Sequence, residues 1–360
     1  MVSTALSRRL RLAAPVLAVG VVAAGVTVPR LADAADASAA LPPRTAAQLL
    51  EDVSQADVDG LSGTVVATSR LGLPELPSDG GGGSAVSLTG LLAGSTTARV
   101  WEAGDDRSRV AVDAPFAEFD VVRDGRDVWT FDSASSDVTH LVLPEGTAPQ
   151  DVPAPSGTAT PQDLAERLLS YVEPTTTVTV GRAEEVAGRA AYELVLEPKD
   201  RGTLVDEVRL AVDGETSVPL RVQVFGVGQP EPAVEVAFTS VRFAVPDASV
   251  FDFTPPAGST VTERSLEDLA AGKAPETADG AQAPAPTSLP QVLGSGWSTV
   301  VETSGVQLPE DAQGLLGQLS SPVEGGRTIT SALLSVLLTD DGRMLVGSVP
   351  PARLVELAGR

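Results

Sequence analysis

Few residues of this chain have the chemistry of a catalytic or metal-binding group. The only histidine is His140, which falls inside a predicted strand, and the chain has no cysteine. A relay or a zinc site needs more than one such side chain, so a lone strand histidine is more often a surface or packing residue. The sequence contains no G-x-S-x-G turn and no glycine-rich phosphate loop with its Lys and Ser/Thr.

Carboxylates are abundant, but their spacing indicates no acid–base site. Asp105-Asp106, Glu184-Glu185 and Asp340-Asp341 fall in predicted turns or a polar stretch. The segment Asp57–Gly60 is similar to part of a calcium loop, but in that register the loop ends at Val66, which has no ligand atom to offer. Two carboxylates brought together by folding could still serve a glycosidase, so hydrolysis stays open as an alternative. We expect no enzyme, no metal site and no cofactor.

The charge of the chain excludes one class of partner. The 360 residues carry a formal net charge of −23, and the basic residues are almost all arginine. Phosphate backbones repel such a chain, and no basic cluster follows residue 30, so we expect no nucleic-acid binding. The absence of cysteine leaves packing as the source of stability and excludes a lipidated N-terminal cysteine.

The N-terminal segment has the order of a secretory signal. Arginines precede the apolar run Leu12–Val28, and small residues with the A-x-A site Ala32–Ala34 follow it. Residues 1–40 are therefore predicted to be a signal peptide or a signal anchor. The run is shorter than the ~20 residues of a spanning helix, which favours cleavage. The predicted location is extracytoplasmic, in the cell envelope or secreted, with residues 12–28 as a membrane tether if the segment is retained.

The elements that must position any site follow an α+β pattern. A capping box at Thr45–Gln48 predicts a helix over 46–56, and Thr160-Pro161 predicts a second helix. Asp124-Gly125 is a strong hairpin signal. Strands are expected over 61–69, 99–103, 108–113, 119–123, 126–132, 138–143, 176–180, 190–198, 205–212, 220–226 and 234–245. Hairpin-length connections without alternating βαβ units predict an antiparallel sheet.

Composition divides the chain into segments. The glycine-rich stretch 71–90 predicts a flap or a solvent loop, and the Pro/Ala-rich acidic stretch 264–290 predicts a linker. The remaining parts are a main domain over 44–263 and a small C-terminal α+β module over 291–360. In that module, strands are expected over 297–302, 327–338 and 343–349, and a helix over 351–357.

Four segments carry a resemblance to a known family. They are DGRDVWTFD at Asp124–Asp132, GRAAYELVLEPK at Gly188–Lys199, the turn from Val212 to PLRV at Pro219–Val222, and FDFTPPAG at Phe251–Gly258. In this order they resemble the LolA/LolB/RseB-like superfamily (outer-membrane lipoprotein carrier and sigma-E regulatory N-terminal domain type), here of the kind found in high-GC Gram-positive bacteria. The resemblance covers about residues 44–263. It implies a strongly curved antiparallel sheet, a half-open β-barrel, covered by helices. The C-terminal extension is closer to the RseB-like layout.

The resemblance also implies a function. It indicates an exported, non-enzymatic binding protein of the cell envelope that holds an acyl chain or lipoprotein-like ligand in an apolar cavity between sheet and helices. A concave apolar face needs no catalytic group to bind a lipid. The candidate lining residues are the larger apolar positions of the predicted meander: Val110, Val112, Phe119, Val121, Trp129 and Phe131. Each of them could instead fill a solid core.

Two alternatives stay open. One is an RseB-like regulator or sensor that contacts a membrane-anchored protein, such as an anti-sigma factor, through residues 291–360. The other is an envelope hydrolase. The expected partners are thus a lipid or acylated protein, or a membrane-anchored regulatory or transport protein.

Overall fold

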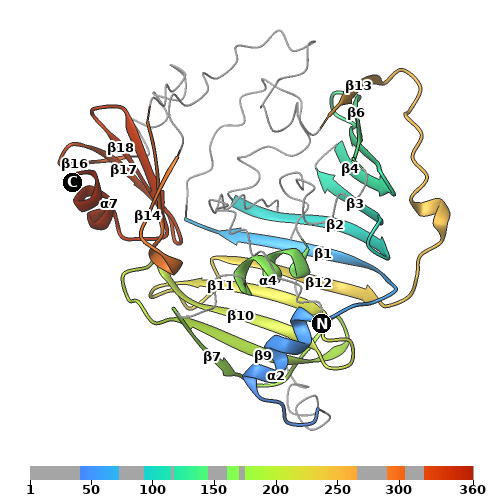
Figure 1. Cartoon of the computed structure of the whole chain (residues 1–360), viewed down its shortest axis with the longest axis horizontal. Helices are drawn as coiled ribbons and strands as arrows, with labels where there is room; N and C mark the ends of the chain where they lie inside the picture. Colours follow the sequence, from blue (N-terminus) through green and yellow to red (C-terminus); the bar gives the residue numbers. More distant parts are fainter. Residues whose placement is uncertain are drawn as a thin grey trace, which may run out of the picture.

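The computed structural model describes residues 41–72, 93–114, 117–144, 160–169, 175–265, 290–304 and 320–359. Over these residues the chain forms a large curved sheet and a smaller C-terminal sheet (Figure 1). The predicted signal segment and nearly all of the predicted flap and linker lie outside the described residues. Within the described ranges, no helix has both the length and the apolar character that crossing a membrane would require.

The main sheet has thirteen strands in the order β13-β6-β5-β4-β3-β2-β1-β12-β11-β10-β9-β7, and β8 also pairs with β9. The strands are β1 (Gly60–Arg70), β2 (Ala93–Ala103), β3 (Arg107–Ala114), β4 (Ala117–Asp124), β5 (Asp127–Asp132), β6 (Asp137–Val142), β7 (Thr176–Val180), β8 (Glu184–Val186), β9 (Arg189–Pro198), β10 (Val205–Asp213), β11 (Pro219–Gly226), β12 (Val234–Arg242) and β13 (Thr260–Arg264). The sheet bends around an open side (Figure 1), which confirms the predicted half-open, α+β architecture.

Two helices lie on the concave face of this sheet. Helix α2 (Ala46–Ser54) begins with the predicted capping box, in which Thr45 Oγ1 accepts from the Gln48 backbone N–H and Gln48 Oε1 accepts from the Thr45 N–H. Its buried residues Leu49 and Val53 join the core formed by β9 to β12. Helix α4 (Pro161–Leu169) packs on β11 and β12, and its Leu164 contacts both halves of the main core.

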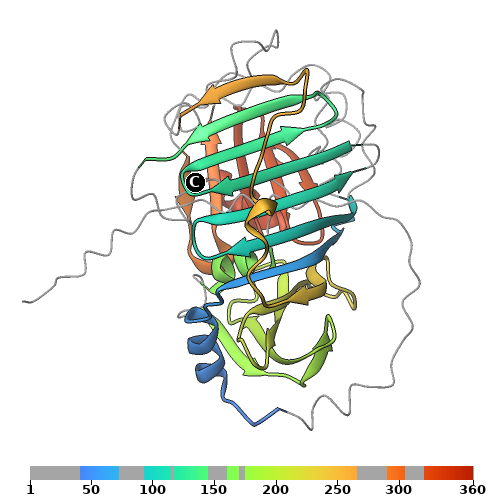
Figure 2. The same cartoon turned by 90° about the vertical axis from the view of Figure 1, so that its right-hand side faces the viewer.

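A strap, residues 243–259, crosses the convex face of the sheet between β12 and β13 (Figure 2). It contains the short helix η2 (Ala248–Val250) and the buried Phe251. Because the strap carries the chain across the whole face, β13 joins the far edge in parallel with β6. This pair corrects the expectation of a wholly antiparallel sheet.

The C-terminal sheet has six strands in the order β14-β15-β19-β18-β17-β16. They are β14 (Gln291–Leu293), β15 (Val300–Ser304), β16 (Ser321–Val323), β17 (Gly326–Thr330), β18 (Ser335–Thr339) and β19 (Arg343–Gly347), with η3 (Gly296–Ser298) between β14 and β15 and α7 (Pro351–Ala358) after β19. Helix α7 covers one face, where Leu354 packs with Val300, Leu337 and Leu345.

The strand predicted over 327–338 is wrong in one respect, because it is broken into β17 and β18. Ser331 and Leu334 close a turn between them: the Ser331 N–H donates to the Leu334 carbonyl, and the Leu334 N–H donates to Ser331 Oγ. The turn sends Leu333, which is 2% exposed, into the core of the main domain. Gly296–Ser298 forms η3, so the strand predicted over 297–302 begins at Val300 and not at residue 297.

Further contacts attach the module to the main domain. The Ser348 carbonyl accepts from the Leu204 N–H at 2.7 Å and from Thr203 Oγ1 at 2.8 Å. The Trp297 indole donates to Thr176 Oγ1 at 2.8 Å. These bonds, with Leu333, give the two sheets a defined relative position.

Candidate functional site

The concave face of the main sheet carries two apolar rows that cross β2, β3 and β4. The strand register places Val100, Val110 and Val121 in one row, and Ala98, Val112 and Phe119 in the other. Cross-strand partners share a face because side chains alternate along each strand. Val100 belongs to the same cluster as Leu61, Val65 and Phe238, so the rows continue the core under α4. The six side chains carry no charge and no hydrogen-bonding group.

The apolar surface extends toward the next strands. Val121 packs against Val128, Leu141 and Leu143, which form a buried cluster of their own. Val128 pairs with Leu141 across β5 and β6. Apolar side chains thus continue on the concave face from β2 to β6, beside the threonines and aspartates that the register also places there on β5 and β6. This part of the sheet lies beyond the main contacts of α2 and α4 with β7, β11 and β12.

The structure separates the six predicted lining residues into two groups. Val110, Val112, Phe119 and Val121 lie together on the concave face. Trp129 and Phe131 lie on the convex face, where both rings contact Phe253 of the strap, with centroid distances of 5.4 and 6.4 Å. Lining of a ligand site by the first group stays a prediction, and the second group packs under the strap.

The Asp124-Gly125 hairpin explains this separation. The turn pairs Asp124 with Asp127, so Val121 faces Thr130 and Val122 faces Trp129 across β4 and β5. Trp129 must then lie on the face opposite to Val121. The same register places Val128 on the concave face, and the hairpin signal in the sequence could have identified it.

Charged residues of these strands gather on the convex face. Arg109 donates to both carboxylate oxygens of Asp120, with Nη2 at 2.5 Å from Oδ2, and also to the Val250 carbonyl of the strap. His140, the only histidine of the sequence, is on this face as well. Its Nε2 lies 2.8 Å from Asp127 and its Nδ1 2.9 Å from Glu263 on β13. Both ring nitrogens are thus engaged in holding three strands together.

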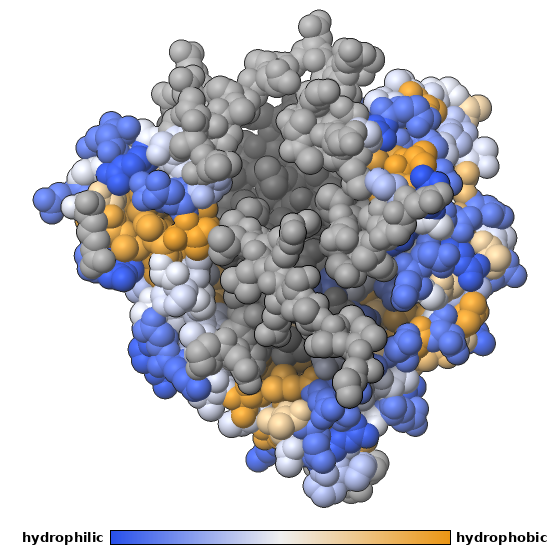
Figure 3. All heavy atoms as spheres, in the orientation of Figure 1, coloured by the Kyte–Doolittle hydropathy of each residue, from blue (hydrophilic) through white to orange (hydrophobic). Residues whose placement is uncertain are grey.

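The C-terminal sheet has a second apolar face, on the side away from α7. One row crosses five strands and consists only of β-branched aliphatic residues: Val292, Val301, Val346, Val336 and Ile329. Leu338 pairs with Met344 in the next row. In Figure 1, α7 lies on the outer side of the module, so this row is on the side of the sheet turned toward the main domain. Apolar residues are also visible on the described surface of the module in Figure 3.

Neither a protein-family model nor a curated protein matches the chain. Similar solved structures include the Pseudomonas aeruginosa MucA/MucB complex, with 17% identity over 87% of this chain and 96% of that chain, at a TM-score of 0.46. A LolA superfamily protein from Nitrosomonas europaea is 16% identical over 59% of this chain and 99% of its own, at a TM-score of 0.24. LprF from Mycobacterium bovis is 12% identical over 60% of this chain and 97% of its own, at a TM-score of 0.31. The superfamily that the sequence segments resemble is thus represented among the similar structures. At these scores and identities, the likeness carries no conclusion about a ligand or partner of this chain.

Proposed function

We propose that this chain is an exported binding protein of the cell envelope that holds the acyl chain of a lipid or an acylated protein against the concave face of its main sheet. The observation that carries the proposal is the pair of uncharged rows on β2 to β4, Val100–Val110–Val121 and Ala98–Val112–Phe119. A surface of this kind offers an acyl chain burial without any directional bond. Each buried methylene contributes about 0.8 kcal/mol.

The second apolar face supports the same proposal. An acyl chain is desolvated fully only when apolar side chains meet it from more than one side. The row from Val292 to Ile329 belongs to a sheet that is fixed to the main domain through Leu333 and Ser348. We therefore assign it to a second wall of the same site.

Location and chemistry complete the proposal. The predicted signal segment would deliver the chain to the side of the membrane where envelope lipids are handled. We propose binding without catalysis, because His140 already has Asp127 and Glu263 on its two ring nitrogens and is on the opposite face of the sheet. A hydrolase would need a different acid–base pair.

Native mass spectrometry of the full chain, purified from its own host, tests the proposal directly. We expect an adduct with the mass of a lipid that is lost after delipidation and restored by adding a fatty acid. A fluorescent fatty acid should then bind the delipidated protein and lose affinity in Val110→Asp and Val121→Asp. Val142→Asp is the matched control, because Val142 is on the convex face and 45% exposed. A protein that is reproducibly empty and does not take up the probe would exclude this function.

A regulator that contacts a membrane-anchored protein through the C-terminal module is the second candidate. The favouring observation is that one turn of the module, at Leu333, is part of the main core, so a partner bound to the module could sense the state of the main domain. Crosslinking in the host, followed by mass spectrometry, should recover a membrane protein with the wild-type chain. Recovery should fall when Val292, which is 40% exposed, is changed to Asp. An unchanged set of crosslinked proteins would eliminate this candidate.

A further inference from the structure

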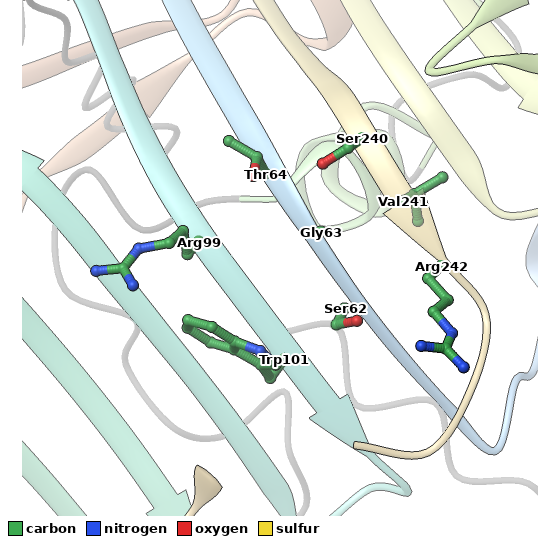
Figure 4. A pocket seen from close by; sticks show the side chains of 8 residues that line it. All are labelled: Ser62, Gly63, Thr64, Arg99, Trp101, Ser240, Val241 and Arg242. Atoms are coloured by element: carbon green, nitrogen blue, oxygen red, sulfur yellow. The ribbon is translucent and has the colours of Figure 1, made fainter. Parts of the chain in front are cut away.

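A shallow depression is present on the convex face, across β2, β1 and β12 (Figure 4). Its volume is ≈ 300 Å³. The register arranges six outward side chains as two rows of three, Arg99–Thr64–Ser240 and Trp101–Ser62–Arg242. Gly63 and Val241 complete the lining. This place is on the other side of the sheet from the proposed acyl site.

The charge of the depression differs from that of the chain. The protein has a formal net charge of −23, yet among the described residues the charged side chains that line the depression are both arginines, Arg99 and Arg242. Arg99 has two exposed carboxylate partners outside the lining, Asp113 at 3.4 Å and Glu118 at 3.2 Å. Arg242 is exposed and forms no ion pair with any of the described residues. A guanidinium that has no carboxylate partner is available to donate charge-assisted hydrogen bonds to an anionic ligand.

The floor of the depression offers hydroxyl groups. Ser62, Thr64 and Ser240 form no side-chain hydrogen bond to any other described residue. Each hydroxyl can both donate and accept, which is the capacity that the hydroxyls of a ligand require. The adjacent Gly63 has no room for a Cβ, which would lie 2.4 Å from the Ser240 carbonyl oxygen. β1 and β12 therefore approach each other closely beneath the two rows of side chains.

Trp101 supplies an apolar wall that is held in place. The guanidinium carbons of Arg99 and Arg109 lie 5.7 and 5.8 Å from its ring centroid. Arg109 is itself fixed by Asp120 and by the Val250 carbonyl of the strap. Figure 4 shows the indole beside Ser62, with Arg242 on the other side of that serine. The Trp101 ring, the three hydroxyl groups and the Arg242 guanidinium thus line the same depression.

We propose that this depression binds an acidic sugar, that is, a single saccharide unit that carries a carboxylate or a phosphate. Arg242 takes the anionic group; Ser62, Thr64 and Ser240 take the ring hydroxyls; and Trp101 packs against the apolar edge of the ring. The volume of the depression corresponds to about ten waters at ~30 Å³ each, which is enough for one such unit.

The test is a titration of the ¹⁵N-labelled full chain, followed through the indole N–H signals of its three tryptophans. The Trp101 signal is identified by its loss in Trp101→Phe, and Trp297, whose indole donates to Thr176, is an internal control. The probes are glucuronate, glucose 6-phosphate, glucose and inorganic phosphate. We expect the two acidic sugars to shift the Trp101 signal in a saturable way, with glucose and inorganic phosphate binding at least about tenfold more weakly.

The variants decide whether the contact is the one proposed. Arg242→Gln should weaken binding of glucuronate about tenfold, since it removes a charge-assisted hydrogen bond. Arg182→Gln is the matched control, because Arg182 is also exposed and unpaired among the described residues but lies outside the depression. Ser240→Ala serves as a second variant should Arg242→Gln fail to fold by circular dichroism.

Three outcomes would overturn the proposal. The first is a Trp101 signal that no acidic sugar shifts. The second is equal binding of glucose and glucuronate, or of inorganic phosphate and glucose 6-phosphate, which would remove the anion or the sugar from the assignment. The third is equal affinity in Arg242→Gln and Arg182→Gln.

Discussion

The His140 ring stacks flat on the Trp129 ring, with centroids 3.8 Å apart and an angle of 9° between the planes. His140 is on β6 and Trp129 is on β5, and the two residues are direct partners in the strand register. Asp127 and Glu263 hold the edge of the imidazole in this position. Because Glu263 is on β13, the only histidine of the chain fastens the end of the strap to the rest of the sheet.

This contact predicts a pH-dependent stability. Burial disfavours the charged imidazole, but the hydrogen bonds that it donates to Asp127 and Glu263, with the negative charges of these carboxylates, outweigh it and raise the pKa of His140 above its ordinary value. A histidine whose pKa is raised by folding stabilises the fold fully at a pH below its unfolded-state pKa of ~6.5. This stabilisation is lost as the pH rises through the folded-state pKa. No other side chain of this chain ordinarily titrates between about pH 6 and 8.

Urea unfolding of the wild type and of His140→Gln across this range measures the effect. The wild type should lose free energy of unfolding as the pH rises, whereas the variant should stay nearly constant. Val142→Thr, at an exposed position of the same strand, is the control and should follow the wild type. Parallel curves for wild type and His140→Gln would contradict the assignment.

A second prediction concerns the buried carboxylate Asp213, which is 1% exposed. It accepts from Arg189, with Nη2 at 3.0 Å from Oδ1, and from the backbone N–H groups of Glu215 and Thr216. Burial alone would raise the pKa of Asp213, but these hydrogen bonds lower it below its ordinary value. Asp213→Ala should cost about 2–4 kcal/mol of unfolding free energy, because it leaves these donors and the guanidinium without their acceptor.

Glu215 is the matched control, because it binds the same arginine at 2.8 Å but its side chain is 82% exposed. Glu215→Ala should change stability by less than about 0.5 kcal/mol. The stabilisation by Asp213 should be present above its unfolded pKa of ~3.9 and lost as the pH falls through the folded value. Chemical denaturation at pH 7 and at pH 3 compares all three proteins, and equal losses for the two alanine variants would refute the argument.

Some of this architecture is readable from local sequence. The capping box at Thr45, the helix start at Thr160-Pro161 and the Asp124-Gly125 turn depend on neighbouring residues only, and each forms as the pattern predicts. The hairpin also determines which residues of β4 and β5 share a face. The separation of Trp129 from Val121 was therefore present in the sequence, although both are large apolar residues of one meander.

The rest depends on contacts between distant segments. The parallel pair β13–β6 requires a strap that crosses the sheet. No local sequence pattern indicates that Thr260 pairs with Asp137 across these strands. The break between β17 and β18 lies in a run of small and aliphatic residues that is compatible with one strand. The break occurs because the Leu333 side chain is buried in the core of the main domain. The depression of Figure 4 likewise combines β2, β1 and β12, which are far apart in sequence.

The role of Leu333 gives a third prediction. Leu333→Ala should destabilise the main domain by about 2–4 kcal/mol, because it leaves a cavity among residues such as Leu194 and Leu210. Amide hydrogen exchange in β9 to β11 should become faster. Leu354→Ala makes the same substitution in the module's own core and should accelerate exchange in β18 and β19 instead. If Leu333→Ala affected only the module, the attachment of the two sheets through this turn would be wrong.

Gly63 gives the last prediction, on the close approach of β1 and β12. A Cβ at this position would lie 2.4 Å from the Ser240 carbonyl oxygen and 2.9 Å from Phe238 Cδ1. Both neighbours are fixed: the carbonyl belongs to the backbone beside the bulge at Thr239, and Phe238 is 3% exposed. Gly63→Ala should therefore cost about 1–3 kcal/mol through overpacking. Gly359→Ala, whose added Cβ meets its nearest atoms at 3.6 and 3.9 Å, should be close to neutral in the same urea-unfolding experiment. Equal stability of the two variants would mean that the strands can separate at Gly63 without cost.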